Sequence, residues 1–417
     1  MQVVYTHCAG LDVHKRTVVA CCLTPDPEGG WHSETRTFHT MTVDLLGLSD
    51  WLRGHGVTHV AMESTGEYWR PVYNILEAEF ETLLVNAAHV KNVPGRKTDV
   101  RDAQWLAELL QHGLLRPSFI PPAPIRELRD LVRHRSNFVR ERATLVNRVQ
   151  KVLEGANIKL ASVATDVMGV SGRRMLEAII GGEAEPEVMA ELARGRLRAK
   201  RVELAKALDG RVRAHHRFVL TELLSQIDSL DETITRFDEQ IAEASRPFVE
   251  AVARLDTIPG VGRETAEMIV AEIGVDMTRF PSANHLAAWA GVAPGNHESG
   301  GKRLSGRVRK GNQALRKGLV QAAHAAAHTK NTFLAAQYQR LQRRRGRKRA
   351  VLAVAHSILV IAYHLLAREE EYRELGGDYF DRQRPEATAQ RLTQRLEKLG
   401  YHVILQQPES AEVCASA

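Results

Sequence analysis

The fold of this 417-residue chain is decided by residues 7–23, HCAGLDVHKRTVVACCL. Two short apolar runs, His7–Leu11 and Thr17–Leu23, flank the turn His14-Lys15-Arg16 and predict a strand, a turn and a second strand. The first strand ends at Asp12, where the apolar run stops. The opening therefore predicts a pair of strands that presents a carboxylate at one strand end.

The first 115 residues continue this alternation. The loop Pro25–Gly30 leads to a third expected strand near His32–His39. The remaining expected elements are a helix at Val43–Arg53, a strand at Val57–Met62, a helix at Glu67–Glu79, a strand at Thr82–Asn86 and a helix that begins near Thr98. The order βββαβαβα is that of the ribonuclease H-like fold, with three antiparallel strands followed by crossover units in a mixed sheet. We therefore predict an α/β fold, with an N-terminal ribonuclease H-like (RuvC-like) domain over residues 1–116.

Four acids fall at matching places in this topology. Glu63 ends the strand that neighbours the Asp12 strand, and the helix capped by Thr98 carries Asp99 and Asp102. A single strand-end acid is common, and acids in a first helical turn favour the positive end of any helix. Four carboxylates so close repel one another unless a cation neutralises them, and hard oxygen ligands suit Mg²⁺ or Mn²⁺. The acids thus predict a divalent-metal site for phosphodiester chemistry.

The region 117–250 is expected to be helical. Four prolines (Pro117, Pro121, Pro122, Pro124) form a linker, and a long helix at Ile125–Leu153 follows. A further helix is expected from Glu187 to Leu208, while the rest of 155–215 is hard to interpret. A heptad seam predicts a coiled-coil assembly region and consists of Leu220, Leu223, Ile227, Leu230, Ile234, Phe237 and Ile241. The seam is compatible with an antiparallel hairpin inside the chain and with a contact between protomers.

A mostly helical domain is expected over residues 251–370, before a tail at 371–417. Its opening, IPGVGRETA at 258–266, has the pattern of a helix-hairpin-helix element, in which Gly260, Gly262 and Arg263 would meet a nucleic-acid phosphate. An ordinary tight turn between helices is the alternative. Residues 302–317 hold seven cations and no acid: Lys302, Arg303, Arg307, Arg309, Lys310, Arg316 and Lys317. A second run lies at 340–349, so phosphate contact is favoured over a merely solvated face.

The remaining composition limits the class of protein. The net charge of +7 permits nucleic-acid binding without proving it. The four cysteines show neither metal-ligand spacing nor a disulfide framework, which fits a reducing cytoplasm. No run is expected to reach the ~18 apolar residues of a membrane span.

The motifs together resemble the DEDD transposases of insertion-sequence family 110 and their 1111 subgroup. The resemblance lies in GLDVHK (10–15), MESTG (62–66), KTDVRDA (97–103), IPGVG (258–262), RFPS (279–282), AAWAGVAP (287–294) and HESGGKR (297–303). It implies that Asp12, Glu63, Asp99 and Asp102 form a metal-binding tetrad and that Ser299 forms a covalent phosphoserine link to DNA. It also implies a structured noncoding guide RNA. It carries no roles onto residues 155–215 or the tail.

Ser299 is expected in a glycine-rich loop just before cations that could stabilise a phosphate. Without the family it would be an ordinary loop serine, and His297, the nearby candidate base, is expected to face solvent. We therefore expect the tetrad and its metal to activate Ser299, with a homodimer or tetramer sharing the site. The main alternative is a junction-resolving nuclease that uses the tetrad alone. An actin-like kinase is a further alternative, but it would need a glycine-rich phosphate loop after Asp12. A catalytically inactive DNA-binding relative is another, but it would not need all four acids and the serine.

Overall fold

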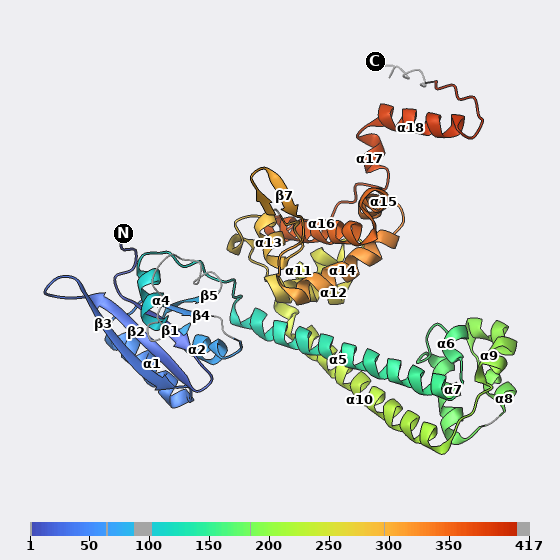
Figure 1. Cartoon of the computed structure of the whole chain (residues 1–417), viewed down its shortest axis with the longest axis horizontal. Helices are drawn as coiled ribbons and strands as arrows, with labels where there is room; N and C mark the ends of the chain where they lie inside the picture. The colour runs from blue at the N-terminus through green and yellow to red at the C-terminus, as the bar shows by residue number, and fades with distance from the viewer. Residues whose placement is uncertain (1, 64–65, 87–101, 184, 296, 407–417) are drawn as a thin grey trace, which may run out of the picture. The chain divides into compact units, whose positions relative to one another are not determined.

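The computed structural model describes residues 2–63, 66–86, 102–183, 185–295 and 297–406. Its internal contacts divide the chain into two units, Met1–Ile120 and Pro121–Ala417, whose elements are labelled in Figure 1. Asp99 and the expected helix cap Thr98 lie outside the described residues. The expected four-part division of the chain by function stays a prediction.

The first unit is a five-stranded mixed sheet. Its elements are β1 (Cys8–Val13), β2 (Thr17–Pro25), β3 (Trp31–His39), α1 (Thr42–Gly54), β4 (His59–Glu63), α2 (Trp69–Leu76), β5 (Glu81–Val85) and α4 (Asp102–Gln111). The strand order is β3-β2-β1-β4-β5. The first three strands pair antiparallel, and β4 and β5 continue the sheet parallel to β1. The predicted mixed sheet and its order of elements are confirmed.

The two faces of the sheet have separate cores. Leu11 of β1 and Met62 of β4 pack in one cluster with the apolar side chains of α1 and α2. Cys8 and Ala61, from the same two strands, pack in the other cluster with Leu106 of α4. Because successive side chains of a strand point to opposite faces, this assigns each strand residue to the α1/α2 face or to the α4 face.

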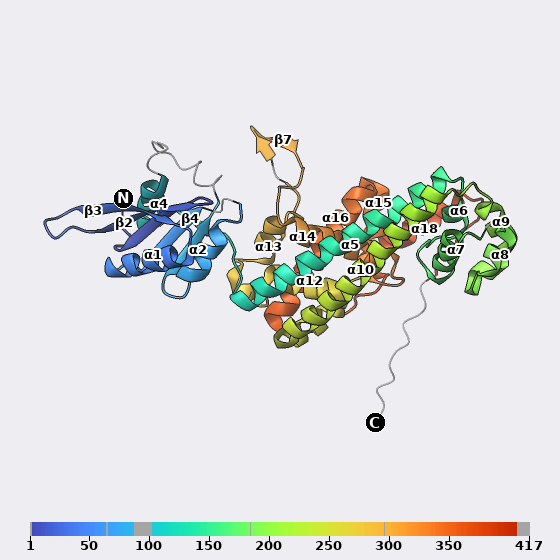
Figure 2. The ribbon, with the colours of Figure 1, turned by 90° about the horizontal axis from the view of Figure 1, so that it is seen from below.

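The second unit begins with two long helices, α5 (Ala123–Gly155) and α10 (Ala214–Ala244), which lie side by side in Figures 1 and 2. Ion pairs join Arg135 to Asp238 and Arg142 to Asp231. The partner's number falls as the α5 number rises, so the helices are antiparallel. The heptad seam therefore finds a partner within the chain, with its ends buried and Leu230, Ile234 and Phe237 half-buried. A contact between protomers stays a prediction.

Short helices connect α5 to α10 and pack into a core of their own. They are α6 (Leu160–Val163), α7 (Val170–Gly181), α8 (Pro186–Glu191), η2 (Gly195–Lys200) and α9 (Arg201–Leu208). The expected continuous helix from Glu187 to Leu208 is wrong, because the chain turns between α8 and η2. Gly195 there has φ +55°, a conformation outside the right-handed helix.

The rest of the second unit is a helical bundle with one hairpin. Its elements are η3 (Arg246–Phe248), α11 (Val249–Asp256), α12 (Arg263–Ile273), η4 (Met277–Arg279), α13 (Ala283–Ala290), β6 (His297–Ser299), β7 (Lys302–Ser305), α14 (Gln313–His328), α15 (Phe333–Arg345), α16 (Arg347–Arg368), α17 (Tyr379–Arg382) and α18 (Pro385–Glu397). Among the described helices, α16 alone is long and apolar enough to cross a bilayer, which corrects the expectation that no such run exists. It is half buried and packs against α13, α14 and α15, as a core helix does.

Candidate active site and nucleic-acid interface

Asp12 and Glu63 end neighbouring parallel strands on the same face of the sheet. The register pairs Leu11 with Met62, which makes Asp12 and Glu63 the next pair along β1 and β4. Glu63 follows Ala61 by two residues, and Ala61 belongs to the α4 face. The Asp12 carboxylate is 23% exposed, and its Oδ2 lies 3.1 Å from Nε2 of His14. Both carboxylates therefore border the space beside α4.

Helix α4 lies directly on β1 because position 10 is a glycine. A Cβ added to Gly10 would stand 2.1 Å from the carbonyl oxygen of Ala103 and 2.5 Å from the amide nitrogen of Ala107. Cys8, two residues earlier, places its Sγ 3.6 Å from the carbonyl oxygen of Ala107, and burial raises the pKa of this thiol to about 12. Helix α4 therefore runs antiparallel to β1 across the sheet. The beginning of α4, Asp102, is the end directed toward Asp12.

The carboxylates of Asp12, Glu63 and Asp102 supply hard oxygen donors of the kind that divalent cations prefer. All three residues are half-buried, although Oδ1 of Asp102 is itself buried. The described residues contain no group of three or more acid, histidine or cysteine side chains close enough to hold an ion. Asp99, the fourth expected ligand, is not among them. The predicted tetrad therefore rests on the strand register and on the packing of α4 over Gly10.

Ser299 is the last residue of β6, and it is exposed. It pairs with Lys302 across a two-residue turn in which Gly300 and Gly301 have φ +56° and +73°. Positive φ at both central residues is typical of a type I′ hairpin turn, where glycine is favoured. The expected glycine-rich loop is this two-residue turn, and Ser299 stands in the strand beside it and not in the loop itself. Figure 2 shows this hairpin projecting beyond α13 and α14.

The two arms that carry the hairpin touch backbone to backbone. A Cβ on Gly295 would stand 2.1 Å from the carbonyl oxygen of Arg307, and one on Gly311 would stand 2.5 Å from the carbonyl oxygen of Trp289. Only glycine permits such an approach. The arms are therefore a close-packed stem, which determines where Ser299 stands relative to α13 and α14.

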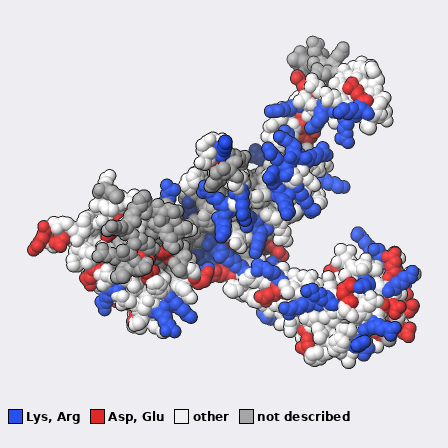
Figure 3. Space-filling model, in the orientation of Figure 1, with Lys and Arg blue, Asp and Glu red and all other residues white. Residues whose placement is uncertain are grey.

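The expected nucleic-acid contacts occupy several places around this stem. Lys302 is in β7, and Arg307, Arg309 and Lys310 are exposed on the returning arm, while Arg316 is half-buried in the first turn of α14. The backbone of Arg303 is in β7, but its side chain and that of His297 lie outside the described part. Cations thus stand beside the serine and along the stem, on the surface seen in Figure 3.

The expected helix-hairpin-helix element is the turn between α11 and α12. A Cβ on Gly260 would lie 2.4 Å from the amide nitrogen of Ala326, so this glycine serves the packing of α14. Gly262 has open space and precedes α12 without a capping side chain. Arg263 is 65% exposed but donates to Oε1 of Glu267 at 2.9 Å. Gly262 and Arg263 are accessible to a phosphate, whereas Gly260 is explained by its close packing against α14.

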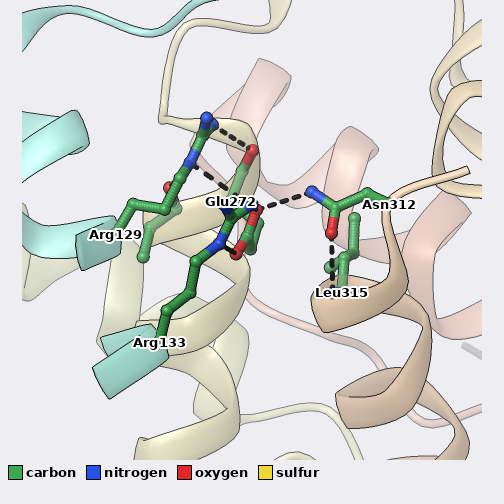
Figure 4. Close-up of polar contacts among 6 residues, drawn as sticks. Arg129, Arg133, Glu272, Asn312 and Leu315 are labelled. Atoms are coloured by element: carbon green, nitrogen blue, oxygen red, sulfur yellow. Dashed lines mark hydrogen bonds and ion pairs between the residues drawn. The ribbon is translucent and has the colours of Figure 1, made fainter. Parts of the chain in front are cut away.

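A buried carboxylate of α12 joins the long helix α5 to the base of the hairpin stem (Figure 4). Glu272 of α12 is fully buried. Arg133 of α5 binds both of its oxygens, at 2.7 and 2.8 Å, while Arg129 donates to its backbone carbonyl at 2.8 Å. Asn312 donates to Glu272 from the other side, and its own Oδ1 caps α14 by accepting from the Leu315 amide at 3.1 Å. Sequence reasoning missed this cluster, although an acid in the apolar run 268–273 was a signal.

Comparison with known proteins identifies two families along the chain. Residues 9–158 match the DEDD IS110 family, described as "Transposase". Residues 252–339 match the family described as "Transposase IS116/IS110/IS902 family". The first match contains the acids of β1, β4 and α4, and the second contains the stem and the hairpin of Ser299.

Two relatives that are named transposases cover three quarters of the chain, and a gene-inverting protein covers about a third of it. The transposase for insertion sequence element IS1111A of Coxiella burnetii is 29% identical over 75% of this chain and 79% of its own length. A probable family 20 transposase of Pseudomonas aeruginosa is 27% identical over 75% and 85%. A pilin gene-inverting protein of Moraxella bovis is 29% identical over 34% of this chain and 45% of its own.

Proposed function

We propose, because the chain belongs to the IS110 family of insertion-sequence transposases, that it cuts and rejoins DNA strands through a covalent bond to Ser299. Transposition or recombination of DNA is the activity that the family and the gene-inverting relative support. The serine step is our own assignment. The observation that carries it is an exposed hydroxyl beside the tip of a hairpin, opposite Lys302 and above a stem of exposed cations.

A DEDD family depends on a divalent metal ion, and the donors at the ends of β1, β4 and α4 fit one. We assign Asp12, Glu63, Asp102 and Asp99 as its ligands, with Mg²⁺ as the ion and Mn²⁺ as a substitute. When bound, such an ion neutralises charge and polarises phosphodiester oxygens. His14, which already contacts the Asp12 carboxylate, orients that ligand.

The proposed reaction exchanges one phosphodiester for another. The Oγ of Ser299 bonds to the phosphorus while the bond from phosphorus to the leaving deoxyribose oxygen breaks. The serine proton is transferred to that oxygen, which leaves as a hydroxyl, and the DNA end stays on the protein as a phosphoserine diester. Attack by the hydroxyl of another strand reverses the step and joins the new partners. Lys302 stands where its charge stabilises the phosphate during both steps.

Trapping of the protein–DNA link tests this proposal. Wild type and Ser305→Ala, whose residue lies on the opposite strand of the same hairpin, are expected to form a covalent adduct with DNA of the element ends. Ser299→Ala is expected to form none. Strand cutting by Ser299→Ala at the wild-type rate would instead identify a nuclease that uses only the acids. Loss of cutting in Asp12→Asn, with folding retained, is expected under both activities.

We also propose a guide RNA and an assembly of at least two protomers. The exposed cations of the hairpin and its stem, Lys302, Arg307, Arg309 and Lys310, support the binding of backbone phosphates, which leaves the choice of sequence to base pairing. Recombination at the full rate by RNA-free protein would contradict the first proposal. Mixed Asp12→Asn and Ser299→Ala proteins are expected to regain activity if protomers share their sites; no recovery under conditions of subunit exchange would contradict sharing.

A further inference from the structure

The turn between α15 and α16 carries seven cations in ten residues. This basic turn consists of Arg340, Arg343, Arg344, Arg345, Arg347, Lys348 and Arg349. All seven side chains are exposed, and none forms an ion pair with any residue that the structure describes. Figure 3 shows Lys and Arg gathered over α15. Like charges this close repel one another, which disfavours the folded turn unless an anion binds and neutralises them.

Three of these seven cations also oppose the dipole of the helix in which they lie. Arg347, Lys348 and Arg349 form the first turn of α16, a helix of 22 residues that begins after Gly346 without a capping side chain. The start of a helix favours anions, so three cations there reduce stability. The arginines at the end of α15 stand at the negative end of their helix, where cations are favoured. The three cations at the start of α16 therefore need an explanation other than helix stability.

The basic turn is held on a firm base. Tyr338 of α15 and Ala350 of α16 are buried on either side of it. Gly346 closes the turn with φ +80°, and the guanidinium of Arg340 lies 5.0 Å above the ring of Phe380 in α17. The family match ends at residue 339, before all seven of these cations. The charges are therefore presented at defined positions that the comparisons do not assign.

We propose that the basic turn binds the phosphate backbone of a nucleic-acid duplex. The inference rests on the proposed function for the presence of that nucleic acid. A membrane surface is disfavoured because the apolar face of α16 is buried and no apolar face accompanies the charges. Between Arg343 and Arg349 the only other residue is Gly346, so the turn offers dense positive charge, which binds backbone phosphates whatever the base sequence. DNA of the element and a structured RNA share this backbone chemistry.

The test combines binding with stability. The variant Arg347→Gln, Lys348→Gln, Arg349→Gln keeps helix propensity, because Gln is about as good a helix former as Arg and Lys. The matched control removes three exposed cations of η2: Arg196→Gln, Arg198→Gln, Lys200→Gln. Affinity of the full-length proteins for labelled duplex DNA and duplex RNA is measured from low to high salt. Melting temperature is measured without nucleic acid.

The α16 variant is expected to bind ~tenfold or more weakly at low salt, with a salt slope smaller by about 0.9 for each DNA phosphate that its side chains no longer neutralise. Its melting temperature is expected to rise by about 2 °C or more, since the charges no longer oppose the helix dipole. The control is expected to bind like wild type. Weakening of DNA binding, of RNA binding or of both identifies the partner.

Three results would overturn the inference: unchanged binding by the α16 variant, an equal decrease in the control, or a lower melting temperature that accompanies the weaker binding. An equal decrease would mean that net charge acts without regard to position. A wild type that binds neither nucleic acid would overturn the proposed function as well. Binding by wild type with no effect of the α16 variant would overturn only this inference.

Discussion

Gly10→Ala is expected to inactivate the acidic site without touching a carboxylate. The new methyl carbon would stand 2.1 Å from a backbone oxygen of α4 and 2.5 Å from a backbone nitrogen, where ordinary contacts begin at 3.4 Å. Neither atom can rotate away, so α4 must retreat from β1 by about 1 Å, the difference between 2.1 and 3.4 Å. Overpacking of this kind costs about 1–3 kcal/mol of folding stability. Because Asp102 begins α4, it moves too.

Displacement of a reacting group by about 1 Å costs on the order of 100-fold in rate. Recombination between two plasmid-borne element ends, measured at saturating DNA, is expected to fall by that factor, while urea unfolding reports the decrease in stability. The controls are Gly47→Ala and Gly54→Ala in α1 of the same unit, where an added Cβ meets nothing within 4 Å. Both are expected to keep full activity, and Gly47→Ala to gain up to about 1 kcal/mol.

The backbone origin of the clash makes a sharper check possible. Ala103→Gly is not expected to rescue Gly10→Ala, because the clashing atom of residue 103 is its carbonyl oxygen. Activity of Gly10→Ala within threefold of wild type, at unchanged stability, would refute the reasoning that α4 is placed by contact with β1. Circular dichroism of each purified variant accompanies the assay, so that a decrease in rate is attributed to displacement of α4 only where the protein is folded.

Three further outcomes are expected. Arg133→Gln leaves the buried Glu272 carboxylate with fewer partners and is expected to destabilise the second unit by about 3 kcal/mol, measured by urea unfolding. Gly295→Ala is expected to lower formation of the covalent adduct at least ~tenfold, because its Cβ would stand 2.1 Å from the carbonyl oxygen of Arg307. In the control Gly155→Ala the added Cβ meets nothing within 4 Å, and adduct formation is expected to equal that of wild type. Burial lowers the pKa of His356 below 6.5, so as the pH falls the imidazole is protonated in the unfolded chain before it is protonated in the folded protein. The folding stability is therefore expected to fall as the pH drops below about 6.5. Melting curves at pH 5 to 8 are expected to show a smaller fall for His356→Gln.

The sheet and the pairing of Asp12 with Glu63 were predictable because both follow from short-range patterns. Apolar runs of strand length identify the strands, and the end of each run marks the acid. The βββαβαβα order then leaves few topologies to choose from, so strand ends far apart in sequence become neighbours. What could not be predicted is how closely α4 approaches, since that depends on a single missing methyl group at Gly10.

The second unit was less predictable for physical reasons that differ from place to place. A heptad period shows that a helix needs an apolar partner but does not say which, so the intrachain pairing of α10 with α5 needed the structure. The hairpin of Ser299 has strands of three and four residues without apolar alternation, which removes the usual strand signal. Only its two glycines suggested a turn. Glu272 was hidden because its two arginine partners lie 139 and 143 residues away in the sequence, in α5.

Both candidate parts of the active site are positioned by backbone contact. Gly10 brings β1 against α4, and Gly295 and Gly311 bring the two arms of the stem together. Packed backbones have no rotamers to relax into, so such contacts transmit displacement almost undiminished. Asp12, Glu63 and Asp102 are half-buried, and Ser299 is exposed. It follows that activity should be more sensitive to added methyl groups at these buried glycines than to polar substitutions beside the reacting side chains, and a scan of both kinds of variant would decide the point.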